Sequence, residues 1–267
     1  MSGLEEARPS RRESLTRAEA RGADEPASEI EIPRAADTLR IQTQAMACHF
    51  AVFLDAQRRE QLDSVSEVLE SVHGLEALMS VYRSESPMSR ANATAAKQDA
   101  VLEETLFEVV ALACRIAEET DGAFDPTTGP LVELWQKARE SGQVPDEGEV
   151  RRVRELGGLD DVAVDVPSRS IRYGRGGVEL NLGGIGKGFA LDRIGAQLLA
   201  KGVEEFLLHG GHSSVLARGG HAEHAGWPVG IRNPLFPTRR LATLLLCQQA
   251  LSTSGSGIES YRIGGRR

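Results

Sequence analysis

Residues 178–220, VELNLGGIGKGFALDRIGAQLLAKGVEEFLLHGGHSSVLARGG, predict a strand, a glycine turn, a helix, a second strand and a second glycine turn. Val178, Leu180 and Leu182 alternate with polar residues at the two-residue period of a half-buried strand. Apolar residues then recur at helical spacing over 189–199, and Gly202 follows as the expected helix end. We expect the rest of the chain to pack around this unit.

The glycine turn before this helix favours an anion as its ligand, because glycines let a ligand approach free amide N–H groups. Its spacing excludes two phosphate-binding motifs. Gly188 stands where a P-loop needs Ser or Thr, and Phe189 replaces the third glycine of a dinucleotide fingerprint. Lys187 opposes the helix dipole unless an anion or an acidic neighbour such as Asp192 offsets its charge. A bound anion and a simple turn both stay open.

Composition limits the class of protein. The chain has 267 residues, 40% of them hydrophobic, which suffices for one large domain with a substantial core. The net charge of -8 and the scattered basic residues argue against a nucleic-acid partner. Three cysteines stand far apart, so neither a disulfide framework nor a zinc site is predicted.

Residues 1–37 predict a disordered tail, because they hold few large aliphatic side chains among many Arg, Glu, Ala, Ser and Pro residues. We expect one domain over residues 38–267. The chain shows neither the apolar region of a secretory signal nor a run long enough for a transmembrane segment. A cytoplasmic location is the default expectation, and an extracytoplasmic one would follow if the start were misassigned.

The remaining periodicity predicts helices mainly in the first half and strands in the second. A first strand or hairpin arm is expected over 39–54, a long amphipathic helix over 62–79 and a loop over 80–96. Further helices are expected at 102–121, 131–135 and 150–156, and strands at 162–164, 171–173, 227–231, 241–246 and 250–253. This order favours an α+β fold, a mixed sheet packed by helices.

Six segments, in chain order, closely resemble the flavin transferases of the ApbE family: SVYRSESPMSRAN (80–92), GAFDPTTGPLVELW (122–135), NLGGIGKGFALD (181–192), LLHGGHSSVLARG (207–219), WPVGIRNP (227–234) and ALSTSGS (250–256). The resemblance covers residues 40–260 and implies a mixed, largely antiparallel sheet packed by helices. It also implies an enzyme with FAD as substrate and Mg²⁺ as metal. Such an enzyme cleaves the FAD pyrophosphate, transfers FMN to a threonine or serine hydroxyl of a protein acceptor and releases AMP.

The resemblance also implies a set of site residues. It places Met46 at the flavin end of FAD and Tyr82 against the isoalloxazine or adenine ring. Asp125 is expected to bind the adenine or a ribose hydroxyl, and the Gly184 carbonyl to bind magnesium. No catalytic residue is assigned. The expected FAD-binding residues are Met46, Tyr82, Ala123, Phe124, Asp125 and Lys187.

One departure from the family affects the metal. A His-x-Ile-Asp-Pro-x-Thr-Gly segment, which supplies magnesium ligands and a candidate general base, is expected beyond the SG turn and does not occur in these 267 residues. We therefore expect a C-terminally incomplete domain that binds FAD weakly and turns it over slowly or not at all. The alternatives are a non-catalytic FAD-binding homologue and an interaction module that binds neither FAD nor metal.

Overall fold

The structure is a computed structural model that describes residues 30–31, 38–211, 213–222, 224–233, 235–236, 238–254 and 263. Its centre is a five-stranded sheet in the order β11-β8-β7-β3-β2, in which every neighbouring pair is antiparallel. The strands are β2 (Thr38–Ala45), β3 (Cys48–Asp55), β7 (Phe206–Gly210), β8 (Ser214–Arg218) and β11 (Gln249–Ser252).

Two smaller antiparallel sheets flank the central one. The first has the order β1-β9-β10, and the second the order β4-β6-β5. Their strands are β1 (Ile30–Glu31), β9 (Trp227–Arg232), β10 (Arg240–Leu246), β4 (Ala100–Val101), β5 (Val162–Asp165) and β6 (Ser170–Tyr173). The predicted α+β class with a largely antiparallel sheet is confirmed.

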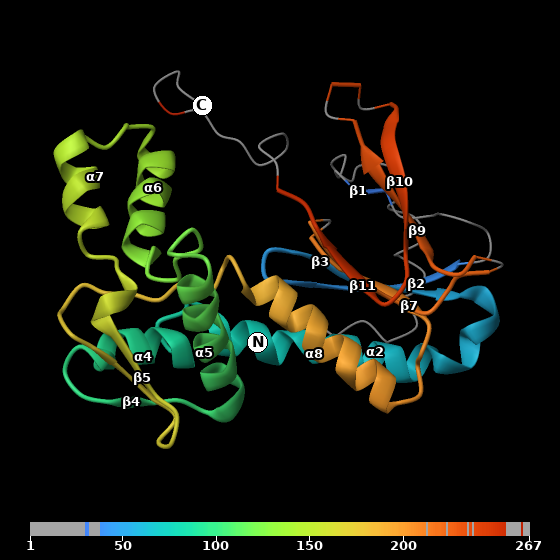
Figure 1. Cartoon of the computed structure of the whole chain (residues 1–267), viewed down its shortest axis with the longest axis horizontal. Coiled ribbons are helices and arrows are strands. Elements are labelled where there is room, and N and C mark those ends of the chain that lie inside the picture. The colour runs from blue at the N-terminus through green and yellow to red at the C-terminus, as the bar shows by residue number, and fades with distance from the viewer. Residues whose placement is uncertain are drawn as a thin grey trace, which may run out of the picture.

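The helices gather on one side of the central sheet and at one end of the molecule. In Figure 1, α2 and α8 lie along one face of the sheet, whereas α6 and α7 stand beyond its end, above α5. The helices are η1 (Ala56–Gln61), α2 (Leu62–Glu70), α3 (Val72–Met79), α4 (Pro87–Ala95), α5 (Glu104–Glu119), α6 (Gly129–Ser141), α7 (Glu147–Arg154), η2 (Leu159–Asp161) and α8 (Gly186–Ala200).

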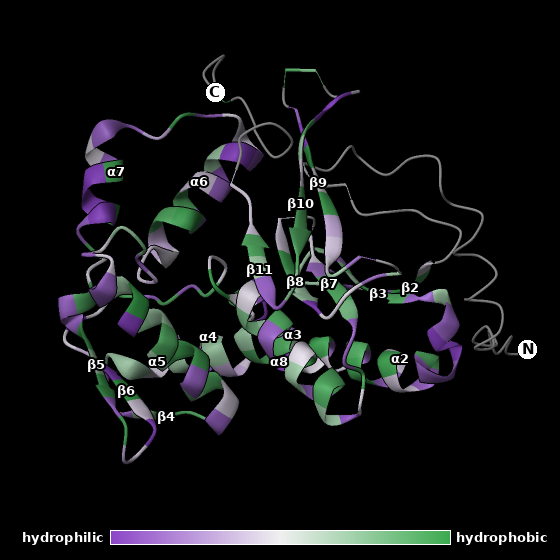
Figure 2. Cartoon of the chain, turned by 45° about the vertical axis from the view of Figure 1, so that its right-hand side comes forward, coloured by the Kyte–Doolittle hydropathy of each residue, from purple (hydrophilic) through white to green (hydrophobic). Residues whose placement is uncertain are grey.

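The central sheet is buried on both faces. Phe50, Val52 and Leu54 of β3 point into the main core, which the helices complete. The intervening Ala51 and Phe53 point into a second core that also contains residues of β9 and β10. Two-sided burial explains the continuous apolar run in β3. By contrast, α7 contributes no buried residue and is strongly hydrophilic in Figure 2.

Three of the predicted elements differ from the structure, and two of them concern helices. The expected loop over 80–96 contains α4, whose start is marked by Ser86 as N-cap, accepting from the Ser89 N–H at 3.0 Å, and by Pro87 in the first turn. The predicted helix over 62–79 is two helices that meet at Ser71. The apolar spacing over 62–79 correctly predicted helical structure there. The capping signal at Ser86 was overlooked.

The segment before the glycine turn is extended but is not a strand of a sheet. Its predicted alternation is correct, because Val178, Leu180 and Leu182 are buried. Within the described part of the chain, however, no neighbouring strand pairs with it. Its backbone instead bonds to the side chain of Asn92 and to the carbonyl of Pro126. Alternation of apolar and polar residues shows which side of an extended segment is buried. It does not show which strand, if any, pairs with that segment.

The predicted tail at 1–37 is described only at Ile30–Glu31, which form β1 and pair with β9. The other residues of that prediction lie outside the described residues, and the domain boundary at 38 stays a prediction. None of the described helices combines the length and the apolar character that a bilayer crossing requires. The cellular location is therefore also still a prediction.

Candidate functional site

The glycine turn is held by its own backbone and by one side chain. The Leu182 carbonyl accepts from the N–H groups of Ile185, at 3.0 Å, and Gly186, at 2.7 Å. Just before it, the Asn181 side chain accepts from the Gly183 N–H at 2.8 Å. These bonds define the turn from which α8 begins.

Three amide groups at this turn remain available to a ligand. Among the described residues, none accepts a hydrogen bond from the N–H groups of Gly184, Lys187 or Gly188. The N-cap residue, Ile185, has no polar side chain with which to cap them. Free N–H groups and the positive end of the helix dipole favour an anion here, which is one of the two interpretations that the sequence leaves open.

Lys187 lies between this turn and the hairpin of β7 and β8. A Cβ at Gly211 would be 3.7 Å from Lys187 Cδ and 3.0 Å from Cys48 Sγ, so both side chains pack on that glycine. The alternative partner, Asp192, forms no ion pair with Lys187 among the described residues. Burial raises the pKa of the Asp192 carboxyl, and the charge of Arg218 opposes this shift. Lys187 thus has no ion-pair partner among the described residues.

Met46 lies in the tight turn between β2 and β3, two residues before Cys48. Met46 and Ala47 both have left-handed backbones, with φ of 50° and 56°, as a two-residue hairpin turn requires. Such conformations are unfavourable for residues other than glycine. The Met46 N–H donates to Glu76 Oε1 at 2.7 Å, which ties the turn to α3. Cys48 follows this turn and packs on Gly211 together with Lys187, so the turn and Lys187 lie on the same side of the molecule.

Asp125 has a structural role in the loop before α6. Its Oδ1 accepts from the Thr127 N–H at 2.7 Å and from the Thr127 hydroxyl at 2.6 Å. Thr127 is fully buried, and its Oγ1 accepts in turn from the Gly158 N–H at 2.7 Å. This is the Asx arrangement that fixes many turns. Because Oδ1 already accepts two hydrogen bonds, a ligand would donate to Oδ2 of Asp125.

The same loop contacts the glycine turn directly. A Cβ at Gly184 would be 3.0 Å from Phe124 Cε2, so the aromatic ring lies against that glycine. The Pro126 carbonyl accepts from the Asn181 N–H at 2.7 Å. Ala123 is exposed at the start of the loop. Thus the predicted tripeptide 123–125 and the predicted glycine turn, far apart in sequence, lie against each other.

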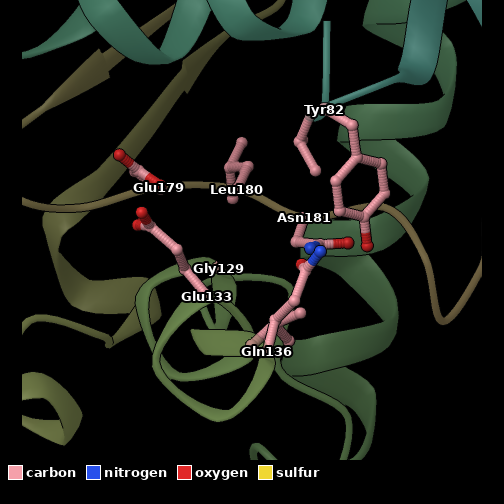
Figure 3. Close-up of a pocket in the computed structure, with 9 residues that line it drawn as sticks. Tyr82, Gly129, Glu133, Gln136, Glu179, Leu180 and Asn181 are labelled. Carbon is pink, nitrogen blue, oxygen red and sulfur yellow. The ribbon is translucent and has the colours of Figure 1, made fainter. Parts of the chain in front are cut away.

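A cavity of about 340 Å³ opens beside this contact. Tyr82 is 73% exposed, and its ring forms one wall, close to Asn181 and Gln136 (Figure 3). On the opposite side, the carboxylates of Glu133 and Glu179 point toward each other (Figure 3). The cavity is lined by Val81, Tyr82, Gly129, Val132, Glu133, Gln136, Glu179, Leu180 and Asn181.

The acidic side of the cavity has a perturbed carboxyl group. Burial raises the pKa of Glu179, the neighbouring charge of Glu133 raises it further, and Lys137 opposes both effects. Lys137 Nζ lies 2.6 Å from Glu133 Oε1. The two carboxylates repel phosphate groups and favour hydrogen-bond donors at this side of the cavity.

Several of the predicted site residues belong to residues 179–188 or lie against them. Lys187 and Gly184 belong to that segment, Phe124 lies against Gly184, and Tyr82 lies beside Asn181 at the cavity (Figure 3). Met46 lies two residues before Cys48, whose side chain packs on Gly211 beside Lys187. Three residues that our sequence analysis did not single out are Asn181, Gln136 and Thr127. Asn181 directly precedes the glycine turn, and this position could have identified it.

The described residues do not fit a complete magnesium site. Gly184, whose carbonyl is the predicted ligand, is exposed. However, no group of three or more His, Cys, Asp or Glu side chains in the described part of the chain could hold a metal ion. Magnesium prefers a near-octahedral set of oxygen ligands with one or two carboxylates. The metal role of Gly184 therefore stays a prediction.

Sequence relatives carry one common description. The chain is 28% identical over 204 residues to an FAD:protein FMN transferase of Klebsiella pneumoniae, covering 76% of this chain. It is 26% identical over 219 residues to the FAD:protein FMN transferase of Escherichia coli, covering 80% of this chain. Each match spans 62% of the relative's own length, so the chain resembles part of each transferase.

Solved structures agree on the fold. The ApbE protein from Thermotoga maritima superposes with a TM-score of 0.74 at 25% identity, over 85% of this chain and 74% of that one. The flavin transferase ApbE from Vibrio cholerae gives a TM-score of 0.70 at 23% identity, over 86% of this chain and 76% of that one. The family model for ApbE matches residues 40–267. The chain belongs to the ApbE family.

Proposed function

We propose that this chain binds FAD and transfers its FMN part to a threonine or serine hydroxyl of a protein acceptor, releasing AMP. One observation carries the proposal. The free amides at the start of α8 and the aromatic cavity lie on one continuous segment, residues 179–188. The relatives named FAD:protein FMN transferase support the same activity.

The two ends of this segment suit different parts of a dinucleotide. The amides of Gly184, Lys187 and Gly188, with the lysine charge, would receive the pyrophosphate. Asn181 lines the cavity and lies three residues before Gly184, a separation of at most about 10 Å of extended chain. A ring of the ligand would stack there on Tyr82. The carboxylates of Glu133 and Glu179 would keep the phosphates away from that end.

In the proposed transfer, the acceptor hydroxyl oxygen forms a bond to the FMN phosphorus, and the bond from that phosphorus to the AMP phosphate breaks. The hydroxyl proton leaves to a base that we do not assign. Lys187 and the free amides would stabilise the negative charge that develops on the leaving phosphate. The Mg²⁺ requirement comes from the family resemblance. No step is assigned to the ion, because the described residues do not complete its site.

A second candidate function is FAD binding without turnover. It is favoured by one observation, the lack of a metal-holding group of side chains among the described residues. FAD affinity of the purified 267-residue chain can be measured by flavin fluorescence. AMP formation and covalent flavin on an added acceptor protein, each with Mg²⁺ and with EDTA, then separate the two functions.

The outcomes of this experiment are distinct. Mg²⁺-dependent AMP release together with covalent flavin supports the transferase. Saturable FAD binding without AMP supports the second candidate. If FAD does not bind at all, both functions are wrong, and an interaction module with this fold is the remaining interpretation.

A further inference from the structure

Asn92 holds the cavity wall from the neighbouring helix α4. Its Nδ2 donates to the Leu180 carbonyl at 3.0 Å, and its Oδ1 accepts from the Leu180 N–H at 3.1 Å. Leu180 is 1% exposed, so water cannot replace these bonds. The two bonds reproduce the pair that facing residues of an antiparallel ladder exchange. One side-chain amide thus stands in for the strand that residues 178–182 lack.

Tyr173 fixes the orientation of this amide. Its hydroxyl donates to Asn92 Oδ1 at 2.6 Å, from the end of β6. Burial raises the pKa of Tyr173, so the hydroxyl keeps its proton and acts as a donor. Oδ1 therefore receives two donors, and Nδ2 must face the Leu180 carbonyl. A reversed amide would place Nδ2 against both donors.

In the sequence, Leu180 lies between two polar residues of the cavity wall, Glu179 and Asn181. In Figure 3 these two side chains lie on either side of Leu180, toward opposite ends of the cavity. The Asn181 N–H is held separately by the Pro126 carbonyl, at 2.7 Å. Successive side chains of an extended segment point in opposite directions. If the backbone rotated or shifted at Leu180, the side chains of Glu179 and Asn181 would therefore both move.

We propose that Asn92 is a positioning residue for FAD binding: its amide holds Leu180 so that Glu179 and Asn181 keep their places in the cavity. This inference rests on the proposed function for its ligand. The two hydrogen bonds between Asn92 and Leu180, here called the clamp, can be tested without any ligand. A failure of FAD binding and a failure of the clamp are therefore separate results.

The ligand-free test is hydrogen exchange at the Leu180 amide in the full chain. Asn92→Leu removes the acceptor of that N–H, so we expect its protection to fall by at least about tenfold while the strands of the central sheet keep theirs. Thr38→Val is the matched control. It removes one side-chain hydrogen bond, to His221 Nε2 at 3.2 Å, at the end of the β2–β3 hairpin opposite to Met46. Unchanged exchange of Leu180 in Asn92→Leu would overturn the clamp.

The FAD test uses affinity at a temperature where every variant is folded. Asn92→Leu should weaken FAD binding about tenfold, because it removes both hydrogen bonds that hold the buried Leu180 backbone in place. Tyr173→Phe should weaken it less, because the two bonds to Leu180 remain possible. Thr38→Val should bind FAD as the unchanged chain does.

Asn92→Asp provides a readout that a purely structural role would not give. A protonated carboxyl has the shape of the amide, and its O–H can donate to the Leu180 carbonyl. An ionised carboxylate instead places an acceptor oxygen against the Leu180 carbonyl, which is also an acceptor, so the two repel each other. We therefore expect FAD affinity, relative to the unchanged chain at the same pH, to recover as the pH falls through the pKa of the new carboxyl. A ratio that does not change with pH, or Asn92→Leu binding FAD normally, would refute the positioning role.

Discussion

Gly129, the first residue of α6, touches the backbone of Glu179. A Cβ at Gly129 would lie 2.8 Å from the Glu179 carbonyl oxygen and 3.0 Å from its Cβ. Both residues line the cavity, so this contact sets the distance between α6 and the segment before the glycine turn.

We predict that Gly129→Ala lowers the free energy of unfolding by about 1–3 kcal/mol, because the methyl group meets backbone atoms that cannot move independently. Denaturant unfolding measures this change. Gly74→Ala is the control, since Gly74 lies within α3 and a Cβ there meets nothing within 4 Å. That substitution should stabilise by up to about 1 kcal/mol. Equal stabilities of the two variants would contradict the close contact.

Tyr82 should contribute to binding and hardly at all to stability. Its side chain is 73% exposed, so Tyr82→Ala removes little buried surface. We expect FAD binding to weaken about 2- to 12-fold, which corresponds to a stacking contribution of about 0.5–1.5 kcal/mol. Tyr82→Phe keeps the ring and should bind nearly as well. Fluorescence titration measures both, and an unchanged Tyr82→Ala would show that the ring does not stack on the ligand.

Lys187 and Lys201 lie at opposite ends of α8, which makes them a matched pair. Lys201 forms an ion pair with Glu67 at 2.7 Å, whereas Lys187 has no ion pair with any described residue. Lys187→Ala should weaken FAD binding about tenfold and reduce the salt dependence of binding, as expected for a charge-assisted contact of about 1.5 kcal/mol. Lys201→Ala should leave affinity unchanged. If the two variants bind alike, the pyrophosphate does not lie at Lys187.

Glu179 should make stability depend on pH. Its pKa is raised above the ordinary 4.5, mainly by burial, so the folded protein binds the proton more tightly than the unfolded chain. Stability from this group is present at low pH and is lost as the pH rises through the folded pKa. Glu179→Gln should therefore raise the melting temperature at pH 7 by up to about 4 °C. At a pH well below 4.5 the difference should vanish, which thermal melts over a pH series would show.

The cysteines should differ in reactivity. Burial, followed by the charge of Glu118, raises the pKa of Cys114 to about 11, and its side chain is buried. Cys247 is exposed. At pH 8 a thiol reagent should label Cys247 rapidly and Cys114 only after denaturation, because the thiolate is the reactive form. Mass spectrometry of the labelled native protein gives the order directly.

Much of the secondary structure could be predicted, because apolar spacing records which side of an element is buried. The helix α5 and the strands β5 and β6 were predicted within a few residues of their bounds. The helix α4 was missed, although Ser86 and Pro87 carry an ordinary start signal. A mid-helix asparagine is also a signal, since Asn is unfavourable there unless its side chain has a partner. Asn92 was not singled out from the sequence.

Taken alone, the sequence determined the family, the α+β class and the group of residues expected at the site, because each depends on local order along the chain. Only the tertiary structure decided how they meet: Phe124 lies against Gly184, Thr127 accepts a hydrogen bond from the Gly158 N–H, and Asn92 takes the place of a missing strand beside Leu180. These contacts join residues that are distant in sequence. No local pattern encodes them, because a hydrogen bond across the fold exists only once both elements have packed.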